Sequence, residues 1–260
     1  MKNNPKIIVR GQDERNPKAL LQVIGKSIES GRRYFGSSGA SLTKQVWDPA
    51  YAESGINPAT AKIGLEGERK TTKILLEWIE DKSNAILIDS IHLPTKEPIE
   101  PIEEEDGVRD EGDTDHALVL GHSVILIDSK AWKEKSAYSV EDQTVKRGRK
   151  HFPGGRVRMN QARYLWTSYL KPFDVNIYGY VCITNEAFII RDRNWWRQGF
   201  KLINHENIIY WLDKLYNEEI PEVDKQAIDV DLISSIVKGA IKPYDVYKEK
   251  LGEDMVRQLL

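Results

Sequence analysis

Residues 115–130 read DHALVLGHSVILIDSK, and this stretch decides the fold. Two apolar runs lie within it, Ala117 to Leu120 and Val124 to Ile127. They meet at Gly121-His122, a two-residue connection typical of an antiparallel β-hairpin. We therefore expect two neighbouring strands in the middle of a β-sheet.

Charged residues stand at the open end of this hairpin. Side chains i and i+2 of a strand share a face, so Asp128 and Lys130 should project together while Ser129 points away. The hairpin register brings Asp115 near Asp128. Two carboxylates and an ammonium group at the edge of an apolar sheet are costly unless they bind a metal or take part in chemistry. An ordinary surface ion pair between Asp128 and Lys130 is the plainer alternative.

The rest of the chain predicts an α/β fold, a mixed β-sheet flanked by helices. Apolar spacing predicts helices at 60–80, 159–170 and 205–216, and strands at 85–88, 176–184 and 187–191. We expect the last two strands to pair across Asn185-Glu186. The chain divides into a helical and irregular N-terminal extension (1–60), a core (61–220) and a helical C-terminal tail (221–260).

Charge is unevenly distributed along the 260 residues. The formal net charge of −2 hides an acidic segment from Glu97 to Asp115 and a basic segment from Lys146 to Arg158, so bulk charge neither supports nor excludes a polyanionic partner. The single cysteine, Cys182, excludes an internal disulfide framework and a thiolate zinc site. The histidines lack the spacing of zinc ligands. No apolar run approaches the roughly 18 residues of a spanning helix, so we expect a cytoplasmic protein without a membrane partner.

Two further polar residues lie on the predicted helices. Glu68 falls on the apolar stripe that includes Leu65 and Leu75, where a carboxylate needs a partner. The alternative is a glutamate held near the helix N-terminus by the helix dipole. Gln161 could orient a water molecule or a nucleic-acid base, or simply face solvent.

The basic segment offers candidate contacts to nucleic acid. Its interleaved glycines let the backbone approach a phosphate, and its arginines offer bidentate donors. The alternative is a solvated loop that balances the acidic segment. The candidate residues are Lys146, Arg147, Arg149, Lys150, Arg156 and Arg158.

An aspartate and an Asp-x-Lys sequence across a hairpin, preceded by a helical glutamate, resemble the PD-(D/E)XK nuclease core. The resemblance narrows to the nuclease-related domain (NERD) family over roughly residues 61–216. The stretches that resemble the family motifs are GLEGE at 64–68, GDTDH at 112–116, IDSKAW at 127–132 and Asn160-Gln161. Asp128 stands where the family more often has Glu.

The resemblance implies a restriction-endonuclease-like core and a metal-dependent nuclease that hydrolyses phosphodiester bonds, of DNA more than of RNA. Its context would be DNA processing or conflict with phage or mobile elements. The ligands implied for Mg²⁺ or Mn²⁺ are Asp115, Asp128, Glu68 and the backbone carbonyl of Ser129. Lys130 and Gln161 would complete the catalytic set.

Two other classes of function stay open. The same fold could serve as a nucleic-acid-binding module without cleavage. A protein-interaction role, or assembly of a homo-oligomer, could use residues 222–260 or the acidic segment 97–115.

Overall fold

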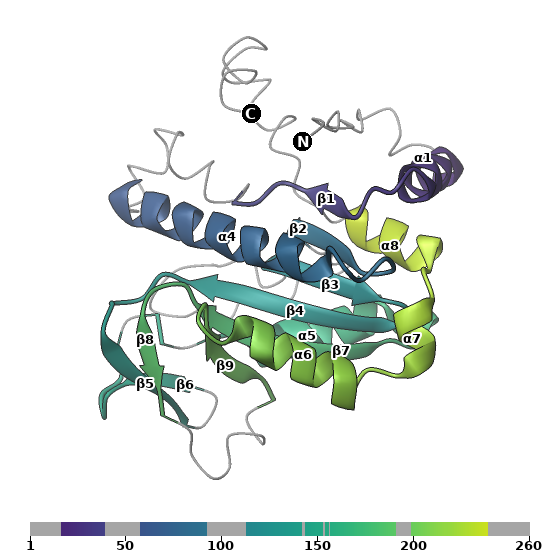
Figure 1. Ribbon diagram of the computed structural model, residues 1–260. Helices are drawn as coiled ribbons and strands as arrows, with labels where there is room; N and C mark the ends of the chain where they lie inside the picture. Colours follow the sequence, from purple (N-terminus) through teal and green to yellow (C-terminus); the bar gives the residue numbers. More distant parts are fainter. Residues whose placement is uncertain are drawn as a thin grey trace.

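The computed structural model describes residues 17–39, 58–92, 113–141, 144–152, 154–155, 157–190 and 199–238 (Figure 1). The acidic segment 97–115 therefore lies outside the described residues, apart from its last three positions. Arg156 and the end of the predicted C-terminal tail, 239–260, lie outside them as well.

A six-stranded mixed sheet forms the centre, in the order β1-β2-β3-β4-β7-β9. Strands β2, β3 and β4 run antiparallel, whereas β1 with β2, β4 with β7, and β7 with β9 run parallel. The bounds are β1 Tyr34–Gly36, β2 Ile86–His92, β3 Asp113–Leu120, β4 Ser123–Lys130, β7 Asn176–Ile183 and β9 Lys201–Asn204. The predicted mixed sheet flanked by helices is confirmed.

Helices cover both faces of this sheet (Figure 1). Apolar side chains of α4 (Pro58–Ile79) and α6 (Ile208–Glu218) pack on one face, against residues such as Leu118 and Ile127. The other face packs against α1 (Pro17–Glu29), α5 (Met159–Tyr169) and α8 (Val230–Val237). Two short elements, the 3₁₀ turn Lys171–Phe173 and α7 (Glu222–Gln226), connect these layers. Burial on both faces explains why β3 and β4 read as nearly continuous apolar runs.

The predicted hairpin is confirmed. Leu120 pairs with Ser123, so the connection is Gly121-His122, and Gly121 has a left-handed φ of 52°. A side chain there would also meet backbone, because a Cβ would lie 2.5 Å from the Cα atom of Asp224. Glycine is therefore required by both conformation and space.

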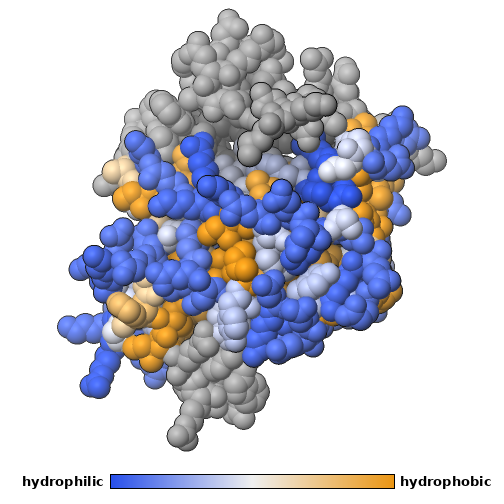
Figure 2. Space-filling model, viewed as in Figure 1, coloured by the Kyte–Doolittle hydropathy of each residue, from blue (hydrophilic) through white to orange (hydrophobic). Residues whose placement is uncertain are grey.

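A separate three-stranded sheet, in the order β6-β5-β8, corrects one prediction. β8 (Ala187–Ile189) runs parallel to β5 (Ser136–Glu141) and does not pair with β7. The reason is that β4 and β9 already occupy both edges of β7. The third strand, β6 (Thr144–Arg147), pairs antiparallel with β5 and contains the first two residues of the basic segment. Figure 2 shows an apolar patch in this region, where Phe188 is 64 % exposed.

Among the described residues, no helix is both long and apolar enough to cross a bilayer.

Candidate active site

The charged residues of the hairpin meet at the end of β4, as predicted. Lys130 Nζ donates to Asp128 Oδ1 at 2.7 Å, and the two side chains are 33 % and 21 % exposed. Asp115 Oδ2 accepts the backbone N–H of Ser129 at 2.7 Å. The hairpin register explains this contact, because His116 pairs with Ile127 and the next position on each strand is an aspartate. Asp115, Asp128 and Lys130 are therefore half-buried, with part of each residue open to solvent.

Glu68 reaches the same cluster from α4. Its side chain is buried, with 3 % of its surface exposed, and Oε2 has no hydrogen-bond partner among the described residues. The charges that act on it most strongly are those of Asp115, Lys130 and Asp128. The predicted position on a buried stripe is confirmed, and Glu66 is exposed as expected.

Two glycines allow α4 to approach this closely. A Cβ on Gly67 would lie 2.7 Å from Thr184 Oγ1 at the end of β7. A Cβ on Gly39, whose φ is 70°, would lie 2.0 Å from Leu65 and 3.7 Å from Glu68 Oε2. Both positions therefore lack room for a side chain, and at Gly67 this gives a physical reason for glycine in the interior of α4.

The charged groups of the cluster shift one another's pKa values. Burial, and then the charge of Asp115, raise the pKa of Glu68 well above its ordinary value. Burial, and then Asp128, raise the pKa of Asp115 to about 7. Burial alone would lower the pKa of Lys130, but the carboxylates of Asp128 and Asp115 outweigh it and raise that pKa. Three carboxylates and one ammonium group leave an excess of negative charge when all are ionised. A further cation or a bound proton would compensate this charge.

The donor chemistry of this cluster fits a hard divalent cation. Carboxylate and carbonyl oxygens are the ligands that Mg²⁺ and Mn²⁺ prefer, and the buried Oε2 of Glu68 is an acceptor without a protein donor. However, the described residues contain no group of three or more His, Cys, Asp and Glu side chains arranged to hold a metal. One oxygen each of Asp115 and Asp128 instead accepts a protein hydrogen bond.

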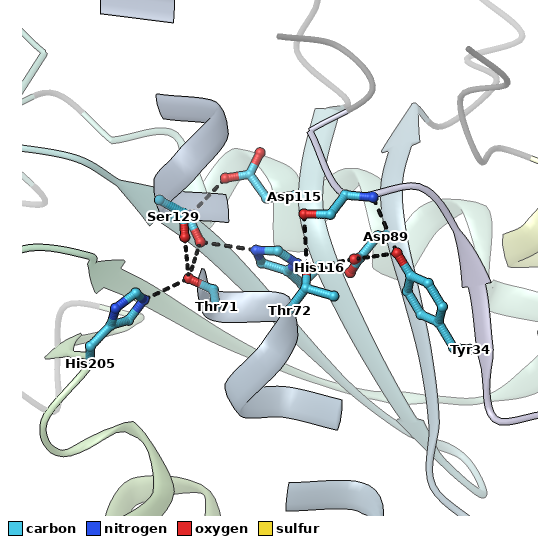
Figure 3. A network of polar contacts seen from close by, with 10 residues as sticks. Tyr34, Thr71, Thr72, Asp89, Asp115, His116, Ser129 and His205 are labelled. Carbon is cyan, nitrogen blue, oxygen red and sulfur yellow. Dashed lines mark hydrogen bonds and ion pairs between the residues drawn. The ribbon is translucent and has the colours of Figure 1, made fainter. Parts of the chain in front are cut away.

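A buried polar network lies directly beside the cluster (Figure 3). His116 Nδ1 lies 2.8 Å from Asp89 Oδ1, and His116 Nε2 lies 2.9 Å from Ser129 Oγ. The network continues from Ser129 Oγ to Thr71 Oγ1 at 2.9 Å, and from there to His205 Nε2 at 2.8 Å. Sequence reasoning set the histidines aside because they lack metal-ligand spacing. The available signal was the position of Asp89 directly after the apolar run 86–88, and of His116 directly before the apolar run 117–120.

The two histidines of this network differ electrostatically. Burial alone would lower the pKa of His116, but the adjacent Asp89 carboxylate outweighs burial and raises it. Burial, followed by the charges of Lys70 and His116, lowers the pKa of His205 to about 4. His205 is therefore neutral near pH 7.

The predicted helical glutamine lies in the first turn of α5. Gln161 is half-buried, whereas Tyr164, three residues further on, is 75 % exposed. Asn160 packs against the backbone of Gly199, where a Cβ would lie 2.3 Å from its Oδ1. The proposed role of Gln161 stays a prediction.

The described basic residues lie on and after the β5–β6 hairpin. Lys146 pairs with Glu141, and the guanidinium of Arg147 lies 5.3 Å from the ring centre of Phe152. Arg149 and Lys150 are exposed in the turn that follows, and Arg158 immediately precedes α5. Lys146 and Arg147 lie in a strand that pairs with β5, whereas the described residues from Gly148 to Arg158 lie in turns and irregular structure.

Residues 63–184 match the nuclease-related domain (NERD). This match confirms the resemblance, and it covers α4, the β3–β4 hairpin, α5 and β7. No curated protein and no solved structure matched the chain.

A nuclease-related domain indicates a nuclease-related function, with nucleic acid as partner and divalent metal use in general.

Proposed function

We propose that this protein is a metal-dependent nuclease that hydrolyses phosphodiester bonds, with DNA preferred over RNA and Mg²⁺ or Mn²⁺ as the ion. The observation that carries this proposal is the buried carboxylate of Glu68, which faces Asp115, Asp128 and Lys130 and whose Oε2 has no hydrogen-bond donor in the described part of the chain. Such a cluster destabilises the fold unless a cation compensates it. The nuclease-related domain supports the same reading.

The ligands proposed for the ion are Asp115, Asp128, Glu68 and the backbone carbonyl of Ser129. A bound divalent ion supplies Lewis acidity, activates water near neutral pH and neutralises charge on the phosphate. The main contribution of the protein is to hold the acids in place: Ser129 N–H orients Asp115, and Lys130 orients Asp128.

Lys130 has a second proposed role. The neighbouring carboxylates raise its pKa, so the ammonium group keeps its charge at neutral pH. An ammonium group fixed beside the acids stabilises negative charge that develops on a phosphoryl group, and it orients the attacking water. Gln161 is proposed to orient the nucleophile or the substrate from α5.

Contacts to the substrate backbone are assigned to the basic segment. Arg149 and Lys150 are exposed after β6, and Lys146 and Arg147 lie on that strand. Exposed cations of this kind bind phosphates without reading sequence. DNA processing, or conflict with phage or mobile elements, is the proposed context.

Purified protein should be incubated with single- and double-stranded DNA and RNA, each with Mg²⁺, with Mn²⁺ and with EDTA. We expect cleavage of at least one DNA form with metal and none with EDTA. The absence of cleavage of every form with both metals would reject the proposal.

One observation favours a second function, a nucleic-acid-binding module without cleavage. The acids accept hydrogen bonds from Lys130 and Ser129, and the described residues show no assembled set of three metal ligands. Binding that responds to salt but not to EDTA or to Asp128→Asn would support this module over the nuclease.

A further inference from the structure

The buried polar network beside the candidate site has no part in the proposed mechanism. The Asp89 and His116 side chains have no exposed surface; Asp89 follows the apolar run 86–88 of β2, and His116 precedes the apolar run 117–120 of β3. Burying such a pair is costly even when it is hydrogen-bonded. Its position beside Asp115 and Ser129 suggests that the pair supports the candidate site.

The hydrogen bonds of this network fix the orientation of the His116 imidazole. Asp89 accepts from Tyr34 Oη at 3.0 Å and lies 2.7 Å from Thr72 Oγ1, so its carboxylate is held from two sides. Since a carboxylate oxygen accepts, the Nδ1 atom of His116 donates to it. The Nε2 atom is thereby aimed at Ser129 Oγ, 2.9 Å away (Figure 3).

Ser129 needs such support because of its place in the sheet. The register of β3 with β4 ends at the pair His116–Ile127, so Ser129 lies beyond the last paired position on that side. Its other edge still pairs with Cys182 of β7. On the unpaired side its backbone N–H donates to the Asp115 side chain, and its hydroxyl group is held by His116 and Thr71.

Ser129 in turn links the buried polar network to the proposed metal ligands. Its backbone N–H holds Asp115, and it stands between Asp128 and Lys130 in sequence, with its side chain on the opposite face of the strand. Fixing the Ser129 hydroxyl therefore fixes the backbone that aims all three charged groups.

The order Asp89, His116, Ser129 is also that of a hydrolase triad, but the imidazole is fully buried. A substrate cannot reach it, so direct catalysis by this series is excluded by access. Support of the neighbouring site is the role that the geometry permits.

We propose that Asp89, His116 and Ser129 are positioning residues of the candidate nuclease site, a hydrogen-bonded series that holds Asp115, Asp128 and Lys130 in register. This inference rests on the proposed function. It adds three side-chain roles to that mechanism, all of them outside direct contact with the substrate.

The test uses Ser129→Ala, which removes the hydroxyl group and keeps the backbone N–H and carbonyl. Ser123→Ala is the matched control on the same strand, because Ser123 Oγ donates to Asp224 Oδ2 at 2.7 Å at the closed end of the hairpin, away from the candidate site. Ser129→Thr retains a hydroxyl group and is the conservative rescue. Mn²⁺ affinity by calorimetry, kcat, KM and urea unfolding are measured for each protein.

We expect Ser129→Ala to weaken Mn²⁺ binding and to lower kcat by about 10- to 100-fold, with KM for nucleic acid within about twofold of wild type. Ser129→Thr should recover most of both losses. Ser123→Ala should lose stability but keep Mn²⁺ affinity and kcat.

Wild-type Mn²⁺ affinity and kcat in Ser129→Ala would overturn the positioning role and leave the nuclease proposal intact. If wild-type protein binds Mn²⁺ but cleaves no nucleic acid, the nuclease proposal is rejected. Weaker Mn²⁺ binding in Ser129→Ala would then still support the positioning role. Wild-type protein that neither binds Mn²⁺ nor cleaves would overturn both.

Discussion

Burial decides the chemistry of single residues at this site. Glu66 and Glu68 are two residues apart on α4, yet the first is exposed and the second is buried among charged groups. The pKa of Glu68 is raised by its burial and by the nearby acids. Identical side chains on one helix therefore have different proposed roles, which gives a matched pair for mutation.

Glu68→Gln should lower metal-dependent cleavage by at least about 100-fold, since it removes a charge proposed to face the ion. Glu66→Gln should change cleavage by less than about twofold. Both rates can be measured in one assay with saturating Mn²⁺. Equal activity of the two variants would remove Glu68 from the proposed ligand set.

The pKa of Asp115 predicts how the stability of the metal-free protein depends on pH. The folded pKa of about 7 lies above the ordinary value of about 3.9, so the folded protein binds this proton more tightly. The stability that this proton contributes is fully present below about pH 4 and is lost as pH rises through 7.

Asp115→Asn removes this titration. In EDTA, the unfolding free energy of wild type minus that of the variant should fall between pH 4 and 8 by at least about 1 kcal/mol, because one pKa unit corresponds to about 1.4 kcal/mol. Urea unfolding of both proteins at several pH values measures it. A difference that stays constant with pH would contradict the raised pKa.

Residue-scale prediction from sequence succeeded where periodicity alone sufficed. The buried stripe located Glu68, and the two-residue period placed Asp128 with Lys130 and Ser129 apart from them. The Asp89–His116 pair was missed because its partners lie on different strands. Their register depends on how a long connection returns the chain, which local spacing does not reveal.

At the scale of elements, α4 is held against the sheet at Gly67. Gly67→Ala would place a Cβ 2.7 Å from Thr184 Oγ1, and Thr184 is buried at the end of β7. We expect a loss of about 1–3 kcal/mol from overpacking. Gly25→Ala in α1 is the control, since its Cβ would lie 3.7 Å from Val230, an ordinary contact.

The Gly25 variant should gain about 0.5–1 kcal/mol from helix propensity alone. Thermal or urea unfolding compares the two variants directly. A Gly67→Ala protein as stable as Gly25→Ala would show that the close approach of α4 is not needed for stability.

The β5–β6 hairpin is the element proposed to bind phosphates. Arg149→Ala with Lys150→Ala should raise KM and reduce the slope of log affinity against log salt by about 1 per lost contact, with kcat little changed. Lys171→Ala, an exposed lysine after α5, serves as the control. An unchanged slope in the double variant would place the phosphate contacts elsewhere.

Long elements were predictable and short ones were not. The helices α4 and α5 follow clear apolar periods, and the strands β3, β4 and β7 read as apolar runs. β1, with three residues, and β9, with four, are too short to show a period. β8 was assigned to the wrong neighbour, because strand order in a sheet is a tertiary property.

At the scale of the whole molecule, segments from both ends of the described chain support the hairpin. Apolar residues of α1 and α8 pack in the same core cluster, on one face of the central sheet. Asp224 accepts hydrogen bonds from Ser123 Oγ and from His122 N–H at the turn, and His122 also contacts Asp229. These contacts hold the closed end of the hairpin, and the candidate site lies at its open end.

The central claim is that the open end of this hairpin binds a divalent metal. Calorimetric titration of Mn²⁺ into wild type and into Asp128→Asn tests it most directly, at neutral pH and without substrate. The account predicts saturable binding to wild type and an affinity at least about 10-fold weaker for the variant. Equal affinity for both proteins, or no binding to wild type, would contradict it.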